Sequence, residues 1–243
     1  MPPLFNPPII DAMAIHVWHA SLAAWVDQVP LFEPWLRDDE RKHAARLMRP
    51  QDHQQFVVCR GLLRKLLEAY GVAPAQQIEF VLGPHQKPRL HERHGAGQWE
   101  FNLSHAGGMA VFALTRARSV GVDVEDLRHI QDADQIVEQQ FAPDERAAYE
   151  SLNPRKRPRA FAALWTRKEA FLKALGTGLH HPLNSFAMNV DPDEPARLLH
   201  VDGDPQAAKN WTIASWWWDA THHVALAAPQ AGLNVIRLES GQP

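Results

Sequence analysis

The sequence has a single cysteine, Cys59, among its 243 residues. This excludes a disulfide framework and any zinc site built from two or more cysteines. Long apolar runs are also missing, since none approaches the ~20 residues of a membrane-spanning helix. The first basic residue is Arg37, and Asn6 and Asp11 interrupt the apolar residues before it. We therefore expect neither a secretory signal nor a membrane span.

The chain also lacks a strong charge of either sign, because 25 basic and 28 acidic residues give a net charge of −3. No basic field indicates nucleic acid as a partner. Hydrophobic residues make up 45% and charged residues 22%, which is the balance of a globular protein that can bury a core. The composition predicts a soluble, cytoplasmic protein with one large domain or two small ones.

Helical and strand patterns are mixed along the chain, which favours an α+β fold. Residues 1–13 hold four prolines and should form an extended lead-in. Helical patterns cover 38–71, with a turn near Pro50, and then 144–152 and 160–175. The expected strands are 14–18, 78–82, 100–103, 109–114, 120–124, 185–190, 211–218 and 223–227.

A shift of 105 residues aligns the sequence with itself. Asp39-Glu40-Arg41 falls on Asp144-Glu145-Arg146, and Gly71 falls on Gly176, each glycine following a long helical pattern. The shared order of strand, helices, glycine and strand favours a duplication over chance identity. We expect two similar α+β halves, residues 14–117 and 118–243, with a site between them.

The second half opens with Gly121-Val122-Asp123-Val124-Glu125. Alternate residues of a strand face the same side, so Asp123 and Glu125 should project together, about 7 Å apart. Two such carboxylates repel each other unless a cation lies between them. They are either a solvated strand face or oxygen ligands of the kind that magnesium prefers.

The helical pattern at 160–175 contains Trp165-Thr166-Arg167-Lys168-Glu169 and, one turn later, Lys173. Glu169 and Lys173 could form an ordinary ion pair on the helix. Lys168 falls inside the apolar stripe, so it must reach solvent or pair with a buried anion such as a phosphate.

The 105-residue offset places Trp18, Ala20 and Arg64 opposite Asp123, Glu125 and Glu169, so only the second half has the three acids. A single magnesium site made of three carboxylates explains this difference. Drift after duplication would explain it as well.

A third group of residues comprises Lys87-Pro88-Arg89 and the segment Phe101-Asn102-Leu103-Ser104-His105-Ala106-Gly107-Gly108. A strand that ends in Ser104 and His105 before two glycines could present a hydroxyl, an imidazole and backbone amides to a phosphate. The same residues could equally form a simple hairpin turn.

Taken together, these segments resemble the 4'-phosphopantetheinyl transferase superfamily of the surfactin (Sfp) type, over about residues 14–228. The resemblance implies a monomeric pseudo-dimer of two α+β halves with the active site between them. It also implies an enzyme that moves the phosphopantetheine arm of coenzyme A to a serine of an acyl or peptidyl carrier protein. Magnesium would assist, and adenosine 3',5'-bisphosphate would be released.

Two alternatives remain beside this function. One is a catalytically silent module that binds a carrier protein or coenzyme A. The other is a magnesium-dependent hydrolase of the coenzyme A pyrophosphate.

Carried over by position, the resemblance assigns magnesium to Asp123, Glu125 and Glu169. Glu169 would also deprotonate the carrier serine, directly or through water, and Lys173 would neutralise the leaving phosphate. Coenzyme A would be held by residues of both halves: Lys87, Pro88, Ser104, His105, Lys168, Lys173 and a basic residue of the first half. That basic residue would be Arg41, with Lys42 or His43 if the alignment slips, and Arg60 as a further candidate.

The loop at 153–159 has four basic residues flanked by prolines. We expect it to help dock an acidic carrier protein, because opposite charge steers association. A solvated loop without a partner is the alternative.

Overall fold

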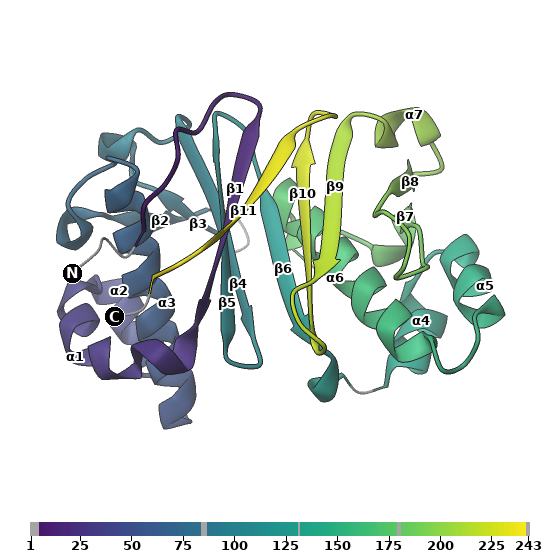
Figure 1. The fold of residues 1–243 in the computed structure, drawn as a ribbon, viewed down its shortest axis with the longest axis horizontal. Helices are drawn as coiled ribbons and strands as arrows, with labels where there is room; N and C mark the ends of the chain where they lie inside the picture. The colour runs from purple at the N-terminus through teal and green to yellow at the C-terminus, as the bar shows by residue number, and fades with distance from the viewer. Residues whose placement is uncertain (1–4, 84–86, 131, 179–180, 242–243) are drawn as a thin grey trace.

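The computed structural model describes residues 5–83, 87–130, 132–178 and 181–241. Two main sheets stand side by side at the centre of the molecule, and helices cover the outer face of each (Figure 1). The strand orders are β11-β1-β5-β4 and β6-β10-β9. In the described part of the chain, no helix is both long and apolar enough to cross a membrane.

The first sheet contains β1 (Ala14–Ser21), β4 (Trp99–Ala106), β5 (Met109–Arg116) and β11 (Asn234–Glu239). The second contains β6 (Gly121–Asp126), β9 (Trp211–Trp217) and β10 (His222–Pro229). All neighbouring strands pair antiparallel except β11, which runs parallel to β1. Two small antiparallel ribbons are β2 (Phe80–Leu82) with β3 (Pro88–Leu90), and β7 (Phe186–Met188) with β8 (Leu198–Val201).

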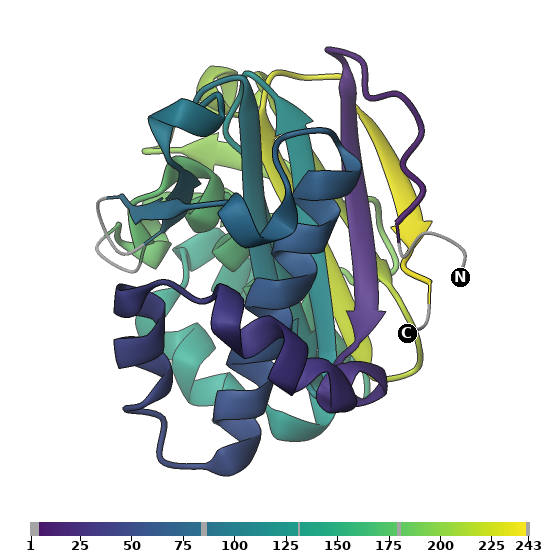
Figure 2. The same cartoon turned by 90° about the vertical axis from the view of Figure 1, so that its left-hand side faces the viewer.

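On the first half, α1 (Val29–Phe32) and α2 (Asp38–Ala44) precede the long α3 (Pro50–Ala69), which lies across the first sheet (Figure 2). On the second half, α4 (Ala133–Gln140) and α5 (Pro143–Ser151) precede the long α6 (Arg157–Leu175), and α7 (Pro205–Ala208) follows. Each long helix ends before a glycine with positive φ, Gly71 at 75° and Gly176 at 73°. A residue without a Cβ adopts this left-handed conformation readily, so both glycines stop their helices.

Side chains alternate between two layers along each strand. In β5, Phe112 and Leu114 pack toward α3, whereas Val111 and Ala113 pack into an aliphatic layer between the two sheets. In the second sheet, Val122 and other inner residues complete this layer, while outward residues such as Ala225 pack toward α6. The predicted α+β fold with two similar halves is confirmed.

Two of the predicted boundaries need correction. Residues 5–13 contain no helix or strand, but Phe5 and Ile10 are buried in the core of the first half, and the Phe5 ring meets Trp18 at 5.1 Å. The lead-in is therefore a packed segment. The second correction concerns residues 234–239, which were placed in the second half without a predicted strand but form β11 and pair with β1 of the first sheet.

The internal repeat is also one residue out of register in its long helices. Glu40 in α2 and Glu145 in α5 are equivalent, because each accepts a backbone N–H from three residues earlier at 2.9 Å. Each carboxylate then pairs with a buried cation of the long helix, Arg64 at 2.5 Å and Lys168 at 2.7 Å. The offset between these cations is 168 − 64 = 104 residues. Lys65, rather than Arg64, is thus the counterpart of Glu169, and the first half still lacks the acid.

His223 of β10 gives the fold a testable pH dependence. Its side chain is buried against Thr166 of α6, and burial, with Arg167 and Arg159 nearby, lowers its pKa to about 3. The unfolded histidine keeps a pKa of about 6.5 and therefore binds a proton that the folded state excludes. We expect the free energy of unfolding to fall as pH decreases between about 6.5 and 3, by up to about 1.4 kcal/mol per pH unit from this group.

Urea unfolding at several pH values measures this slope. The His223→Gln variant should show a shallower slope, and His43→Gln, at an exposed position, should keep the slope of the original protein. Equal slopes in all three proteins would remove His223 as the cause.

Candidate active site

The candidate site lies where β4, an edge strand of the first sheet, runs beside β6, an edge strand of the second. The backbone N–H of Val122 in β6 donates to Asn102 Oδ1 in β4 at 2.8 Å, so the two halves are joined there by a buried hydrogen bond. The position agrees with the expected site between the halves.

The acid pair of β6 projects as the strand alternation predicts. Val122 and Val124 lie in the aliphatic layer between the sheets, and Asp123 and Glu125 therefore face the opposite side, toward α6. Gly121 allows this close packing, because a Cβ there would lie 2.0 Å from the carbonyl oxygen of Ala170. Any other residue would push α6 away from the acids.

Asp123, Ser104 and Lys173 come from three elements, and their polar side chains contact one another. Lys173 of α6 places its Nζ 2.5 Å from Asp123 Oδ1 and 3.0 Å from Ser104 Oγ of β4. Ser104 donates to the same Asp123 oxygen at 2.9 Å. The structure thus brings together three residues that the sequence placed in separate motifs.

The other two acids are close to this triangle and are poorly solvated. Glu125 accepts a hydrogen bond from the Trp165 indole at 3.1 Å, and burial, with the charge of Asp123, raises its pKa to about 7. Burial and the charge of Asp123 also raise the pKa of Glu169. Each carboxylate is therefore harder to ionise than a free side chain, which is the effect of buried like charges.

Asp123, Glu125 and Glu169 offer carboxylate oxygens, which are the ligands that a hard cation binds. Among the described residues, no three His, Cys, Asp or Glu side chains already converge as a formed metal site. However, Asp123 Oδ2 and Glu169 Oε1 are buried and have no hydrogen-bond partner within the described chain. Buried carboxylate oxygens without donors fit a cation such as Mg²⁺, which prefers oxygen ligands.

Lys87 lies directly before β3 and contacts the second half. Its Nζ donates to the backbone carbonyls of Lys173 at 2.7 Å and Val120 at 3.0 Å. Burial lowers its pKa to about 8. Lys87 is therefore held against α6 and the residue before β6, and its contact with coenzyme A stays a prediction.

Ser104 and His105 both lie on β4, and the hairpin turn begins only after Ala106. Their side chains face opposite sides of the strand. Ser104 contacts Asp123, whereas His105 is exposed on the side of α3, where Asp52 is a nearby charge. Of the pair, only Ser104 joins the acids directly.

Residues 16–116 match the family model "4'-phosphopantetheinyl transferase, N-terminal", and residues 119–227 match "4'-phosphopantetheinyl transferase superfamily". The 4'-phosphopantetheinyl transferase HetI of Nostoc sp. is 32% identical over 86% of this chain and 85% of its own length. The chain belongs to the 4'-phosphopantetheinyl transferase superfamily. The predicted family and the prediction that the chain is a transferase are confirmed.

Two further bacterial proteins are similar to this chain. The 4'-phosphopantetheinyl transferase psf-1 of Bacillus pumilus is 32% identical to this transferase over 72% of each chain. The holo-[acyl-carrier-protein] synthase structure of Thermotoga maritima aligns with 46% of this chain and 62% of its own, at a TM-score of 0.37 and 24% identity.

Lys168 was wrongly assigned to coenzyme A in this transferase. The buried anion that it requires is Glu145, whose two carboxylate oxygens each lie 2.7 Å from Lys168 Nζ, and Phe186 supplies a carbonyl at 2.8 Å. Both side chains are fully buried. With three acceptors inside the core, Lys168 has no donor left for a phosphate.

The two arginines of the first half that were expected to bind coenzyme A, Arg41 and Arg60, differ in how free their side chains are. Arg60 lies 3.4 Å from Glu40 and stacks near the rings of Phe56 and Phe80, so it belongs to the core around that carboxylate. Arg41 is half-exposed and pairs with the exposed Asp38 at 2.9 Å. An exposed ion pair of this kind exchanges partners at small cost.

The basic loop at 153–159 is less free than its sequence indicates. Lys156 pairs with Asp193 at 2.8 Å, Arg157 donates to the carbonyl of Glu150, and Arg159 stacks 3.9 Å from the centre of the Trp217 ring. Arg155 is exposed. Its role in carrier docking stays a prediction.

Sequence reasoning missed the roles of Asn102, Gly121 and Trp165. All three lie inside the motifs already quoted, but they act through backbone contacts or a single indole N–H. Of the three, only Asn102 offered a signal in the sequence. Its amide side chain lies in a predicted strand, and a buried polar group requires a hydrogen-bond partner.

A substitution in the Lys168–Glu145 pair tests the corrected role. Lys168→Met leaves a buried carboxylate without its cation, and we expect the free energy of unfolding to fall by about 3–5 kcal/mol. Adding Glu145→Gln should recover much of this loss, because no uncompensated charge then remains. Urea unfolding measures both variants, and coenzyme A binding by the folded fraction should stay unchanged. If Lys168→Met keeps normal stability but loses coenzyme A binding, Lys168 contacts coenzyme A and the corrected role is wrong.

Proposed function

We propose that Asp123, Glu125, Glu169 and Lys173 form the centre at which this transferase moves the phosphopantetheine arm of coenzyme A to a serine of an apo acyl or peptidyl carrier protein. One observation carries the proposal. A lysine ammonium, a serine hydroxyl and buried carboxylates with unpartnered oxygens meet at the junction of the two halves. Such a site can hold anionic phosphates and accept a proton in the same place.

The proposed reaction forms one P–O bond and breaks another. The carrier serine oxygen attacks the phosphorus that bears the pantetheine, and the bond from that phosphorus to the second phosphate breaks. Adenosine 3',5'-bisphosphate leaves with the electron pair. Glu169 takes the serine proton, directly or through water, and its raised pKa brings it nearer to that of a useful base at neutral pH.

Lys173 acts on the leaving group in this proposal. Its ammonium is partly exposed and is shared between Asp123 and Ser104 in the absence of substrate. A phosphate that arrives at this position would compete for the same N–H donors. The positive charge would then stabilise the negative charge that develops on the leaving oxygen.

Asp123, Glu125 and Glu169 would hold magnesium, which the unpartnered oxygens of Asp123 and Glu169 and the raised pKa values of Glu125 and Glu169 support. When bound, the ion would reduce repulsion between the pyrophosphate and its attacker. Coenzyme A would contact Lys87, Ser104, His105 and Arg41. We further propose a cytoplasmic monomer, since the two halves of one chain already supply both sides of the site.

One experiment separates transfer from the two alternatives. The protein is incubated with coenzyme A and magnesium, with and without an apo carrier domain, and both products are measured by mass spectrometry. We expect a carrier that gains the arm, an equal amount of adenosine 3',5'-bisphosphate, and no product when the carrier or the magnesium is removed. Release of nucleotide without a carrier would identify the hydrolase. Binding without any product would identify the silent module.

The Glu169→Gln variant tests the proposed base. The change keeps the size and one ligand oxygen but removes the charge and the proton acceptor. Transfer at saturating magnesium should fall by about 10²-fold or more, while coenzyme A should still bind. Glu150→Gln, on the exposed face of α5, is the matched control and should transfer at the original rate. A normal single-turnover rate for Glu169→Gln once magnesium saturates would leave Glu169 as a ligand and place the base elsewhere.

A further inference from the structure

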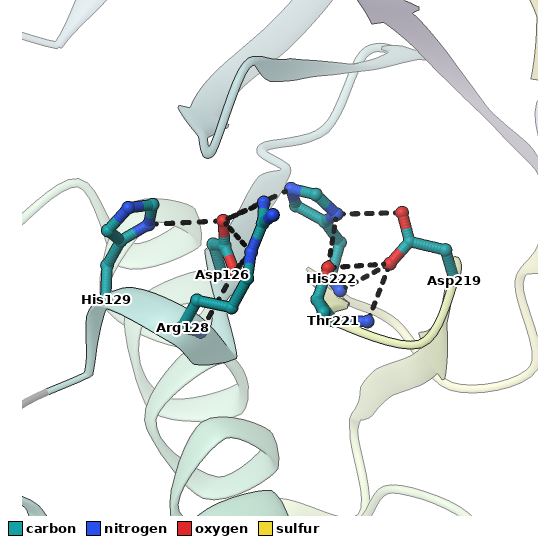
Figure 3. A network of polar contacts seen from close by, with 6 residues as sticks. All are labelled: Asp126, Arg128, His129, Asp219, Thr221 and His222. Atoms are coloured by element: carbon teal, nitrogen blue, oxygen red, sulfur yellow. Dashed lines mark hydrogen bonds and ion pairs between the residues drawn. The ribbon is translucent and has the colours of Figure 1, made fainter.

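A second polar network lies near the candidate site, where β6 ends and β10 begins (Figure 3). Asp126 is the last residue of β6, His222 is the first of β10, and Asp219 precedes His222 in the connecting turn. Asp126 accepts three side-chain hydrogen bonds from Arg128 at 2.7–3.1 Å. His222 Nδ1 lies 2.8 Å from Asp219 Oδ2. The proposed reaction uses none of these residues.

The two central side chains of this network are buried and directed toward each other. Asp126 is 1% exposed and His222 is 8% exposed. Because a carboxylate can only accept, His222 Nδ1 carries the proton toward Asp219. The other ring nitrogen, Nε2, lies 3.8 Å from Asp126 Oδ2 and has no hydrogen-bond partner among the described residues.

Gly107 of the first half rests directly on this pair. It lies in the turn between β4 and β5, with φ at 55°. A Cβ at Gly107 would lie 2.2 Å from Asp126 Oδ2 and 2.6 Å from His222 Nε2. Arg128 holds the Asp126 carboxylate, so it cannot turn aside without losing hydrogen bonds. Only glycine fits this contact, which we term the turn contact: Gly107 against Asp126 and His222.

The turn contact lies at the end of the strand that carries Ser104 and Asn102. Both side chains cross from β4 to β6, Ser104 to Asp123 and Asn102 to the Val122 N–H. We propose that the turn contact is a positioning device: it sets how closely β4 approaches β6 and so keeps Ser104 within reach of Asp123 and Lys173. Gly107, Asp126 and His222 act through these residues and do not touch substrate. The part of this inference that concerns activity rests on the proposed function.

Gly107→Ala tests the proposal, and Gly108→Ala is its matched control. Both glycines have positive φ, 55° and 85°, so both alanines strain the same turn. At Gly108, however, an added Cβ meets nothing within 4 Å. Two readouts are compared: hydrogen exchange of the Val122 amide, and kcat/KM for transfer from coenzyme A. We expect Gly107→Ala to speed the exchange and to lower kcat/KM, each by about tenfold or more, and Gly108→Ala to change neither beyond about twofold.

A second experiment repeats Gly107→Ala in a protein that also carries Asp126→Ala and His222→Ala, and so tests whether the contact causes the effect. There the added methyl of Gly107→Ala has room, so its effect on both readouts should shrink to that of Gly108→Ala. Equal effects of the two glycine variants, an unchanged Gly107→Ala, or a full effect in the alanine background would each overturn the turn contact. If the original protein transfers nothing, the proposed function fails, and the Val122 exchange still decides whether the turn contact holds β4 to β6.

Discussion

An aliphatic layer between the two main sheets determines where polar chemistry can occur in this molecule. It is built from β1, β5, β6 and β10, with Ile15, Val17, Val122 and Val124 among its members. A charged side chain within this apolar layer would lose its hydration without gaining a partner. Asp123 and Glu125 therefore face α6, where Asp123 meets Lys173 of that helix. The packing of apolar residues thus determines where the candidate site lies.

Buried carboxylates serve two purposes in this chain, and their partners distinguish them. Glu145 receives Lys168 and two backbone N–H groups, and Glu40 receives Arg64 and one backbone N–H. These groups are satisfied and link each short helix to its long helix. Glu169, by contrast, retains a buried oxygen without a donor. This contrast agrees with the proposal that Glu169 and its neighbouring acids hold a cation.

Most of the fold and the centre of the site could be predicted from the sequence, because both depend on local patterns. Alternation along Val122–Glu125 determined which way the acids point, and the spacing of Glu169 and Lys173 placed them on one helix. Lys168 could not be assigned in the same way. Its position in an apolar stripe required a buried anion, but the anion comes from Glu145, 23 residues away in α5.

The other errors have related causes. The strand β11 pairs with β1 across more than 200 residues, and no local pattern encodes that pairing. The contacts of Lys87 with two backbone carbonyls could not be predicted either, because carbonyls are present at every position and leave no mark in the sequence. Gly107 was recognised only as part of a turn, because the side chains beneath it belong to the other half.

The return of β11 to the first sheet bears on how the chain folds during synthesis. Residues 14–116 include three strands of that sheet, but β1 has an unpaired edge until residues 234–239 have been made. An exposed strand edge is a template for pairing with other chains. The first half therefore passes through a period of translation in which it is nearly complete and also open to misassembly. Because β11 covers the edge of β1, the first sheet is completed only after the second half has been synthesised.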